Sequence, residues 1–131
     1  MIDLPYDYVR GLVEGEGTFT FDVRTQKMVD GTLKKVKVPA FAIKMHERDE
    51  ELLKSVRYTL NLKNHVYKYD SQVKVRPNTA PQVMFIVREY PSLRDTVIPF
   101  FYKKLHGNKG KQFVEWLERM GDSNTCGFSK S

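Results

Sequence analysis

The chain has 131 residues, a length typical of one domain, and its 40% hydrophobic and 12% aromatic content is too high for a disordered chain. Its one cysteine excludes an internal disulfide, no apolar run is long enough to cross a bilayer, and the N-terminus lacks a signal-peptide pattern. We therefore expect an intracellular protein, in a prokaryotic cytoplasm or an organelle, that is neither secreted nor membrane-bound. The 22 Lys and Arg residues exceed the 16 Asp and Glu residues, and the net charge of +6 favours a polyanionic partner such as nucleic acid.

The first third of the chain is predicted to form three elements: a helix over residues 4–15, a strand over 18–26 and a strand over 32–45. Asp3 is the expected N-cap of the helix, Pro5 suits its first turn, and Gly17 can end it. Asp30-Gly31 is a hairpin turn signal between the two strands.

Alternation of side chains predicts the two faces of this hairpin. Phe19, Phe21 and Val23 are expected on the buried face of the first strand, and Phe41 and Ile43 on that of the second. The opposite parity forms an open face of polar and small side chains: Thr18, Thr20, Asp22, Arg24, Gln26, Lys34, Val36, Val38, Ala40, Ala42 and Lys44.

The rest of the chain is predicted to form a helix from its N-cap Asp49 to about Leu60, strands over 65–70 and 82–88, helices over 92–102 and 108–119, and a polar tail over 121–131. We expect residues 1–120 to form a single domain and the tail to be flexible. The order α-β-β-α-β-β-α-α indicates an α+β fold, with helices packed on one face of an antiparallel four-stranded sheet.

The segment Val9-Arg10-Gly11-Leu12-Val13-Glu14-Gly15-Glu16-Gly17 resembles the LAGLIDADG motif of homing endonucleases. Val13 stands for the motif's Ile, Gly15 for its second Ala, and Glu14 and Glu16 for its two Asp, while Arg10 departs from the pattern. Residues 41–53 and 99–116 are similar to later segments of the family. The resemblance covers about residues 4–120 and implies the LAGLIDADG fold, in which the sheet is concave.

The motif also predicts how two helices could meet. Gly11 and Gly15 lie four residues apart on one helix face, where missing side chains let another helix approach closely. Because the chain has one copy of the motif, we expect the second helix to come from a second chain, which makes a two-fold homodimer. The predicted interface residues are Tyr8, Gly11, Leu12 and Gly15.

The resemblance implies that Glu16, the last acidic residue of the motif, is catalytic and binds the metal, whereas Glu14 supports the helix end or the interface. We expect Mg²⁺, with Mn²⁺ as a substitute and Ca²⁺ supporting binding without cleavage. The family also places a lysine near the scissile phosphate, where it stabilises developing charge. The candidates are Lys103, Lys104 and Lys109. Spacing after Pro99 favours Lys104 and the neighbouring asparagine favours Lys109, so the choice between these two stays open.

A polar residue of the family falls near Met45 in this chain, and methionine cannot orient a water molecule. Either Lys44 or His46 substitutes for it, or the role is missing. The number of metal ions is left open.

The open sheet face carries residue types that suit base edges in the major groove. A ten-residue strand spans about 33 Å, close to one turn of B-DNA, so a dimer would read about twenty base pairs of double-stranded DNA. The predicted DNA-binding residues are Thr18, Thr20, Asp22, Arg24, Gln26, Lys34, Val36, Val38, Ala40 and Lys44 in the first hairpin, and Lys68, Asp70, Gln72, Lys74 and Arg76 in the second.

We therefore predict an intron-encoded, site-specific homing endonuclease. It is expected to make metal-dependent double-strand breaks in a long pseudo-palindromic DNA site as a homodimer. The alternative is an intron maturase acting on structured intron RNA, or a catalytically decayed nucleic-acid-binding module of the same fold. A third reading is a small basic interaction protein, whose binding would not weaken with salt as phosphate contacts do.

Overall fold

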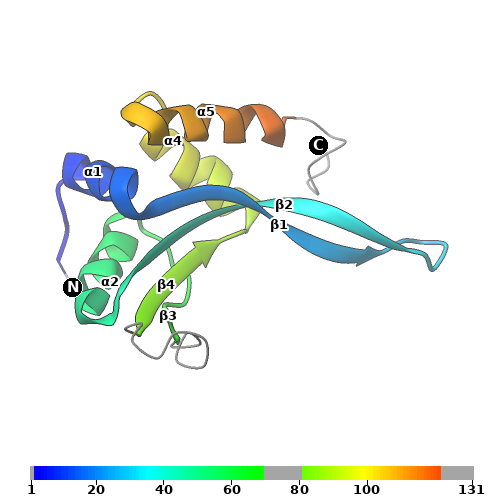
Figure 1. The fold of residues 1–131 in the computed structure, drawn as a ribbon, viewed down its shortest axis with the longest axis horizontal. Coiled ribbons are helices and arrows are strands. Elements are labelled where there is room, and N and C mark those ends of the chain that lie inside the picture. Colours follow the sequence, from blue (N-terminus) through cyan, green and yellow to red (C-terminus); the bar gives the residue numbers. More distant parts are fainter. Residues whose placement is uncertain (1, 70–80, 122–131) are drawn as a thin grey trace.

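The computed structural model describes residues 2–69 and 81–121 (Figure 1). Its elements are α1 (Tyr6–Glu16), β1 (Gly17–Lys27), β2 (Leu33–His46), η1 (Glu47–Asp49), α2 (Glu50–Thr59), β3 (Tyr67–Tyr69), β4 (Gln82–Val87), α3 (Tyr90–Ser92), η3 (Leu93–Val97), α4 (Ile98–Phe101) and α5 (Gly107–Met120). The predicted order of helices and strands is confirmed, and the helix expected over 92–102 is three consecutive helical stretches. The tail lies outside the described residues from residue 122 onward.

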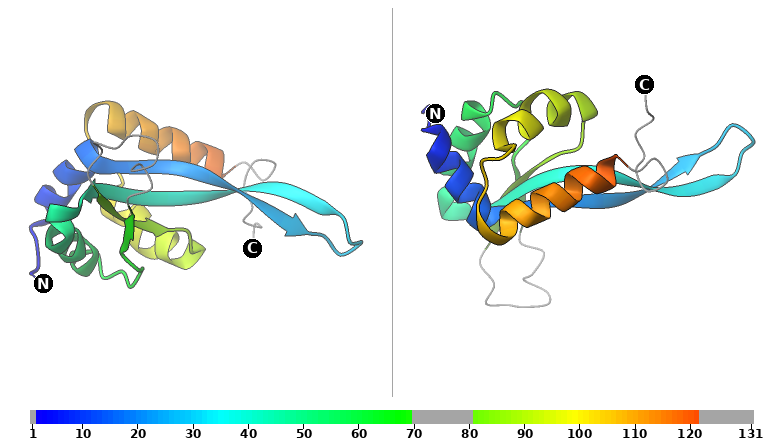
Figure 2. Two further views of the ribbon diagram at one scale, coloured as in Figure 1. Left: turned by 60° about the horizontal axis from the view of Figure 1, so that its bottom comes forward. Right: turned by 90° about the horizontal axis from the view of Figure 1, so that it is seen from above.

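The four strands form one antiparallel sheet in the order β1-β2-β4-β3. β1 and β2 pair along their whole length, from Gly17 opposite Ile43 to Lys27 opposite Leu33. The predicted turn is present between them, and Gly31 adopts a φ of 90°, a conformation that favours glycine. Both views of Figure 2 show this hairpin projecting well beyond the helices.

The core lies on one face of the sheet, as the alternation predicted. Phe19 and Phe41 stack at 5.2 Å between ring centroids, and both also contact the ring of Phe101 on α4. Trp116 of α5 lies 5.1 Å from Phe19 and donates its indole N–H to the carbonyl oxygen of Thr20 (2.8 Å). The fully buried side chains of the other helices and strands join the same cluster, which confirms the α+β layer arrangement.

Two local expectations were wrong. The N-cap of α1 is Pro5 rather than Asp3, because the backbone N–H of Leu4 bonds to Oγ1 of Thr59 on α2 (2.8 Å) and keeps the preceding segment extended. Val23 is 62% exposed although it shares the parity of the buried residues. The described helices end before this part of the hairpin (Figure 1), so within residues 2–69 and 81–121 no helical layer covers it.

Candidate functional site

Helix α1 has one buried face and one open face. Val9 and Val13 are fully buried in the core. The opposite face carries the residues predicted at a dimer interface: Tyr8, Gly11, Leu12 and Gly15. Nothing lies within 4 Å of the place that a Cβ would take at either glycine, and the tyrosine is 47% exposed, whereas the leucine is partly buried against the core. Within the described residues, this face is therefore open to a second helix.

Gly17 joins α1 directly to β1, and the space there fits only a glycine. A Cβ would lie 2.6 Å from Cγ1 and 3.0 Å from the carbonyl oxygen of Val13. The backbone becomes extended at Gly17, with φ of −87° and ψ of 162°. Glu16, the predicted metal ligand, is therefore the last helical residue, and it is exposed at the C-terminal end of α1.

Lys109 of α5 reaches this same junction. Its Nζ donates to the carbonyl oxygen of Gly17 (2.6 Å) and to Oε1 of Gln112 (3.0 Å). Gln112 Oε1 also accepts from the backbone N–H of Phe19 (3.4 Å). Lys109 and Gln112 are about one turn apart, so one face of α5 fixes the start of β1 and places a cation one residue from Glu16. Sequence reasoning missed Gln112, although its spacing from Lys109 was the available signal.

Two charged residues of α1 hold this helix against α4 and the connection between α4 and α5. Oε2 of Glu14 accepts from the backbone N–H of His106 (2.5 Å) and lies 3.1 Å from its Nδ1. Arg10 donates from Nε to the carbonyl oxygen of Phe100 (3.0 Å), and its guanidinium lies 4.6 Å from the centroid of that ring. Glu14 therefore has the supporting contacts expected of it, and the unusual Arg10 has a partner on α4.

The structure places the two candidate lysines differently. Lys104 lies in the turn after α4 and is exposed, with no side-chain partner recorded among the described residues. Lys109 is partly buried and contacts the backbone next to Glu16. The geometry therefore favours Lys109 for a role at the end of α1.

Met45 does not offer a polar group to this junction, because it is 7% exposed and faces the core. Of its two proposed substitutes, His46 uses Nδ1 to accept the backbone N–H of Arg48 that starts η1 (3.0 Å). Lys44 is exposed on the opposite face and follows Ile43, the partner of Gly17 in the ladder. In the ladder, Lys44 therefore lies closer to the end of α1 than His46 does.

The sheet face opposite the helices is polar along the first hairpin, as predicted. Its exposed candidates are Thr18, Thr20, Arg24, Gln26 and Lys34, and Val36 is partly buried. The prediction is wrong for Val38 and Ala40, which are 9% and 1% exposed and so do not present methyl groups to a ligand. Asp22 is one-third exposed and forms an ion pair with Arg88, a residue that the alternation did not single out.

The predicted face is also wrong for Lys68. Its Nζ lies 3.1 Å from Oε1 of Glu50, so Lys68 points toward α2, and the other oxygen of Glu50, Oε2, lies 2.9 Å from Nζ of Lys54. Hydrogen bonds from Lys54 first, and then from Lys68, lower the pKa of Glu50. The reason is the register of β3, which sets Lys68 opposite the core residue Val83. The remaining predicted residues of this hairpin lie outside the described residues: Asp70, Gln72, Lys74 and Arg76.

One protomer offers an incomplete donor set for a divalent cation. Among the described residues, no group of three or more His, Cys, Asp or Glu could hold a metal ion. Glu16 supplies one exposed carboxylate, and the carbonyl oxygens at the C-terminal end of α1 carry partial negative charge that favours a cation. Oxygen donors suit Mg²⁺, which keeps several waters. The chemistry therefore fits such an ion once a second carboxylate joins the site.

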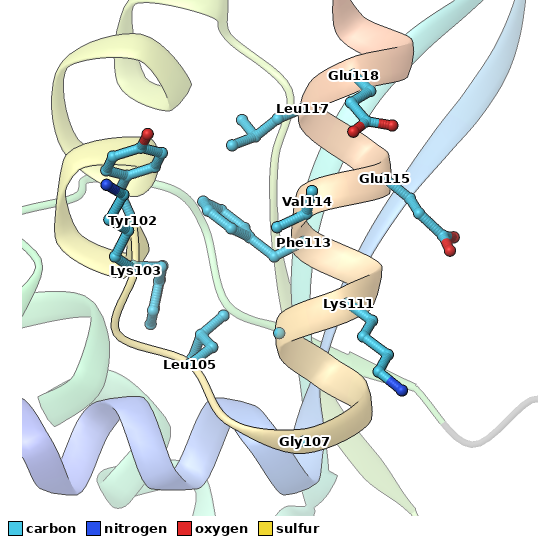
Figure 3. A pocket seen from close by; sticks show the side chains of 12 residues that line it. Tyr102, Lys103, Leu105, Gly107, Lys111, Phe113, Val114, Glu115, Leu117 and Glu118 are labelled. Atoms are coloured by element: carbon cyan, nitrogen blue, oxygen red, sulfur yellow. The ribbon is translucent and has the colours of Figure 1, made fainter.

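A largely apolar groove of about 760 Å³ opens between α5 and the α4–α5 connection (Figure 3). Phe113 and Leu117 point into it from α5, and Leu105 faces them from the connection. Neither Glu16 nor Lys109 lines this groove, which is therefore separate from the junction of α1 and β1.

No helix in residues 2–69 and 81–121 is both long and apolar enough to cross a membrane.

Helix α1 ends at the acidic Glu16 and runs without a loop into the β1–β2 hairpin, so the LAGLIDADG-like segment of the sequence lies where helix and sheet meet. The model of the LAGLIDADG endonuclease family matches residues 9–120, and the chain belongs to this family. The family and the fold predicted from the motif are thereby confirmed. A comparison with curated proteins found no significant match.

Solved structures with the same fold include two homing endonucleases and one meganuclease. I-TnaI is 26% identical, with a TM-score of 0.71, over 91% of this chain and 73% of its own. I-LtrWI bound to target DNA is 23% identical, with a TM-score of 0.70, over 86% of this chain and 35% of its own. I-SmaMI bound to uncleaved DNA in the presence of calcium ions is 21% identical, with a TM-score of 0.69, over 87% of this chain and 35% of its own. The chain thus spans only about a third of the last two proteins.

Proposed function

We propose that this protein is a site-specific endonuclease that cuts both strands of a long, nearly palindromic DNA site as a homodimer and requires a divalent metal ion. The junction of α1 and β1 carries this proposal. There, the exposed Glu16 directly precedes Gly17, whose carbonyl oxygen accepts a hydrogen bond from Lys109. Gly17 also begins β1, the strand with an open polar face. The DNA-bound state of I-LtrWI supports DNA as the ligand.

The open face of α1 supports the homodimer. A second α1 could approach closely over Gly11 and Gly15, because neither has a side chain and the space around both is free. A two-fold axis between the helices would bring the two Glu16 side chains to the same place. The second carboxylate that the metal site requires would then come from the second copy.

The residues at this junction suit phosphodiester hydrolysis. A divalent cation supplies activation of water and stabilisation of the leaving oxygen. Glu16 of each protomer would hold it, with Mg²⁺ as the physiological ion and Mn²⁺ as a substitute. Lys109 holds its ammonium beside the same position, where it would stabilise negative charge that develops on the phosphate. The calcium-containing, uncleaved complex of I-SmaMI supports Ca²⁺ as an ion for binding without cleavage.

The first hairpin would read the DNA. β1 has 11 residues, and at about 3.3 Å per residue it spans about one turn of B-DNA. Each protomer would therefore cover about ten base pairs on its half of the site. We further propose that the gene lies in a mobile intron and that the protein acts inside the cell, where its DNA target is.

A cleavage selection tests this proposal. Purified protein is incubated with a randomised duplex library in Mg²⁺ or in Ca²⁺, beside Glu16→Gln and Glu115→Gln. Glu115 is exposed on α5, outside the junction, and serves as the matched control. We expect Mg²⁺-dependent cuts within one pseudo-palindromic sequence family, lost in Glu16→Gln and kept in Glu115→Gln.

Other outcomes have defined meanings. Sequence-specific retention of duplex DNA without cutting in any metal would contradict the endonuclease and indicate a DNA-binding module. Retention of structured intron RNA in place of DNA would support the maturase. Specific binding and cutting by a protein that sediments as a monomer on DNA would contradict the homodimer.

A further inference from the structure

An ion pair crosses the open face of the sheet. Arg88, which directly follows β4, donates from Nε to Oδ2 of Asp22 on β1. β1 and β4 are not neighbours, because β2 lies between them in the sheet. The two side chains therefore reach toward each other over the central strand.

The register shows why the pair lies on this face. Val87 is fully buried on the helix side, so the next residue, Arg88, takes the opposite side. Continuing the ladder of β2 and β4 by one pair sets Arg88 next to Ala40, and Asp22 is paired with Val38. The ion pair thus crosses β2 at the level of the two small side chains that the structure buries on this face.

The contact leaves the reading edge of the guanidinium available. Arginine has five N–H donors, and the contact recorded within residues 2–69 and 81–121 uses Nε, so with respect to these residues the edge formed by Nη1 and Nη2 remains for a ligand. Two parallel hydrogen bonds from such an edge match O6 and N7 of guanine in the major groove. Arg88 and Asp22 are 34% and 33% exposed, so the pair is partly sheltered but still accessible from the open face.

Asp22 then has a different function from the one its type suggests. A charge-assisted hydrogen bond to a carboxylate is about twice as strong as a neutral one, and it fixes the orientation of a long side chain before binding. The carboxylate also offsets the charge of Arg88, which makes the arginine a poorer contact for an arbitrary phosphate. With Oδ2 engaged and its charge offset by Arg88, Asp22 is less suited to accept from cytosine than an unpaired aspartate, although Oδ1 is not used by this contact.

We propose that Arg88 determines specificity by reading one guanine in each half-site, and that Asp22 is its positioning residue rather than a reader of cytosine. This inference rests on the proposed DNA-binding function of the same sheet face. It adds a reading residue from β4 to the face formed by the first hairpin.

The structure also predicts where this guanine lies. Asp22 is five residues beyond Gly17 along β1. At about 3.3 Å per residue this is about 17 Å from the end of α1, or about five base pairs at 3.4 Å each. The guanine should therefore lie about five base pairs outward from the centre-proximal end of each half-site.

The test measures base preference with the full-length protein on the site found by the cleavage selection. Every base pair of one half-site is replaced in turn, and dissociation constants are measured in Ca²⁺ for wild type, Arg88→Gln, Arg88→Lys, Asp22→Asn and Asp22→Ala. Arg94→Gln and Asp95→Asn are matched controls, because this exposed pair also uses the arginine Nε (2.7 Å) but lies on η3 in the helical layer. Melting temperatures are recorded for all variants, so that the isosteric Asp22→Asn remains informative if Asp22→Ala unfolds.

We expect Arg88→Gln to lower the preference for guanine at one base pair by about fivefold to a hundredfold, the range for one bidentate pair. Asp22→Asn should reduce the preference for guanine at that same base pair, and Asp22→Ala should reduce it further. The two control variants should leave the base preference unchanged at every position. Loss of preference at different base pairs for the two residues would overturn the inference and make Asp22 a reader itself. The inference would also be overturned if Arg88→Gln weakened binding equally to every duplex and lowered the salt dependence of the affinity by the amount expected for about one phosphate contact. A wild-type protein with no sequence preference at all would instead refute the proposed function.

Discussion

Replacing Gly11 by leucine should stabilise one protomer and at the same time prevent the pairing of two. Gly11 lies inside α1, and no atom lies within 4 Å of where its Cβ would be. In a single protomer, the change therefore replaces a poor helix former by a good one without a clash. The gain is about 0.6–0.8 kcal/mol, which raises the melting temperature of a domain of this size by about 2–4 °C.

The effect on association should have the opposite sign, because the leucine side chain would fill the space that a second α1 needs. Sedimentation velocity, with and without target DNA, measures the loss of dimer, and melting at low concentration measures the protomer alone. Gly17→Ala is the matched control. Its Cβ would lie 2.6 Å from Cγ1 of Val13, so it should destabilise the protomer by about 1–3 kcal/mol without touching the open face of α1.

Two results would refute this reasoning. A Gly11→Leu protein that still forms the proposed dimer and cuts DNA as the wild type does would exclude the pairing of α1 helices over this face. A lower melting temperature for the protomer would show that the face is covered within a single chain.

Three further predictions concern charged residues near the junction and on the sheet. Lys109→Met should lower the free energy of unfolding by about 1–3 kcal/mol, because the charge-assisted hydrogen bond to a backbone carbonyl is lost, and should abolish cleavage. Lys104→Met should leave the melting curve unchanged, and loss of cleavage in this variant alone would reverse the assignment. Glu14→Gln should cost about 1 kcal/mol in chemical denaturation, because its bond to the α4–α5 connection weakens, and an unchanged midpoint would contradict that contact. Lys68→Ala should raise the pKa of Glu50 toward its ordinary value of 4.5, as followed by NMR titration. The pKa of Glu50 is lower in the folded state than its ordinary value of 4.5. The stability that Glu50 contributes is therefore fully present above pH 4.5 and is lost as the pH falls through the lowered pKa. The Lys68→Ala protein should consequently lose less stability on acidification than the wild type does. A Glu50 pKa that does not move would place Lys68 away from α2.

The pattern of alternation predicted the buried face of the hairpin correctly but could not predict where the core ends. Phe19 and Val23 have the same parity, yet one is 4% and the other 62% exposed. Parity is a property of the strand, whereas burial depends on which helices lie over it. The length of α5 along β1 is set by tertiary packing, which the local pattern does not contain.

The face of Lys68 was predicted wrongly for a different reason. β3 has only three residues, and a shift of register by one residue moves every side chain of such a strand to the other face. Long-range partners were equally hidden in the sequence. Arg10 appeared only as a departure from the motif, because its partner Phe100 is 90 residues away.

The candidate site was predicted in outline because the motif fixes its chemistry within one short segment. Glu16 and Gly17 follow directly from it, and the structure shows the steric reason for the glycine. The choice between Lys104 and Lys109 was open, because the sequence does not show how the α4–α5 connection folds back on α1. The hydrogen bond from Lys109 to Gly17 supplies that information.

Beyond Phe21, β1 contributes no buried side chain to the protein. At the far end of the hairpin even the apolar side chains of Val29 and Leu33 are exposed. Apart from Asp22, which pairs with Arg88, residues there can be exchanged at little cost in folding free energy, because no core must be repacked around them. The end of the same strand that carries Gly17 tolerates no such change. If the hairpin reads DNA as proposed, target preference could diverge, in nature or in a designed library, while nearly every member would still fold and keep the same residues at the other end of the strand.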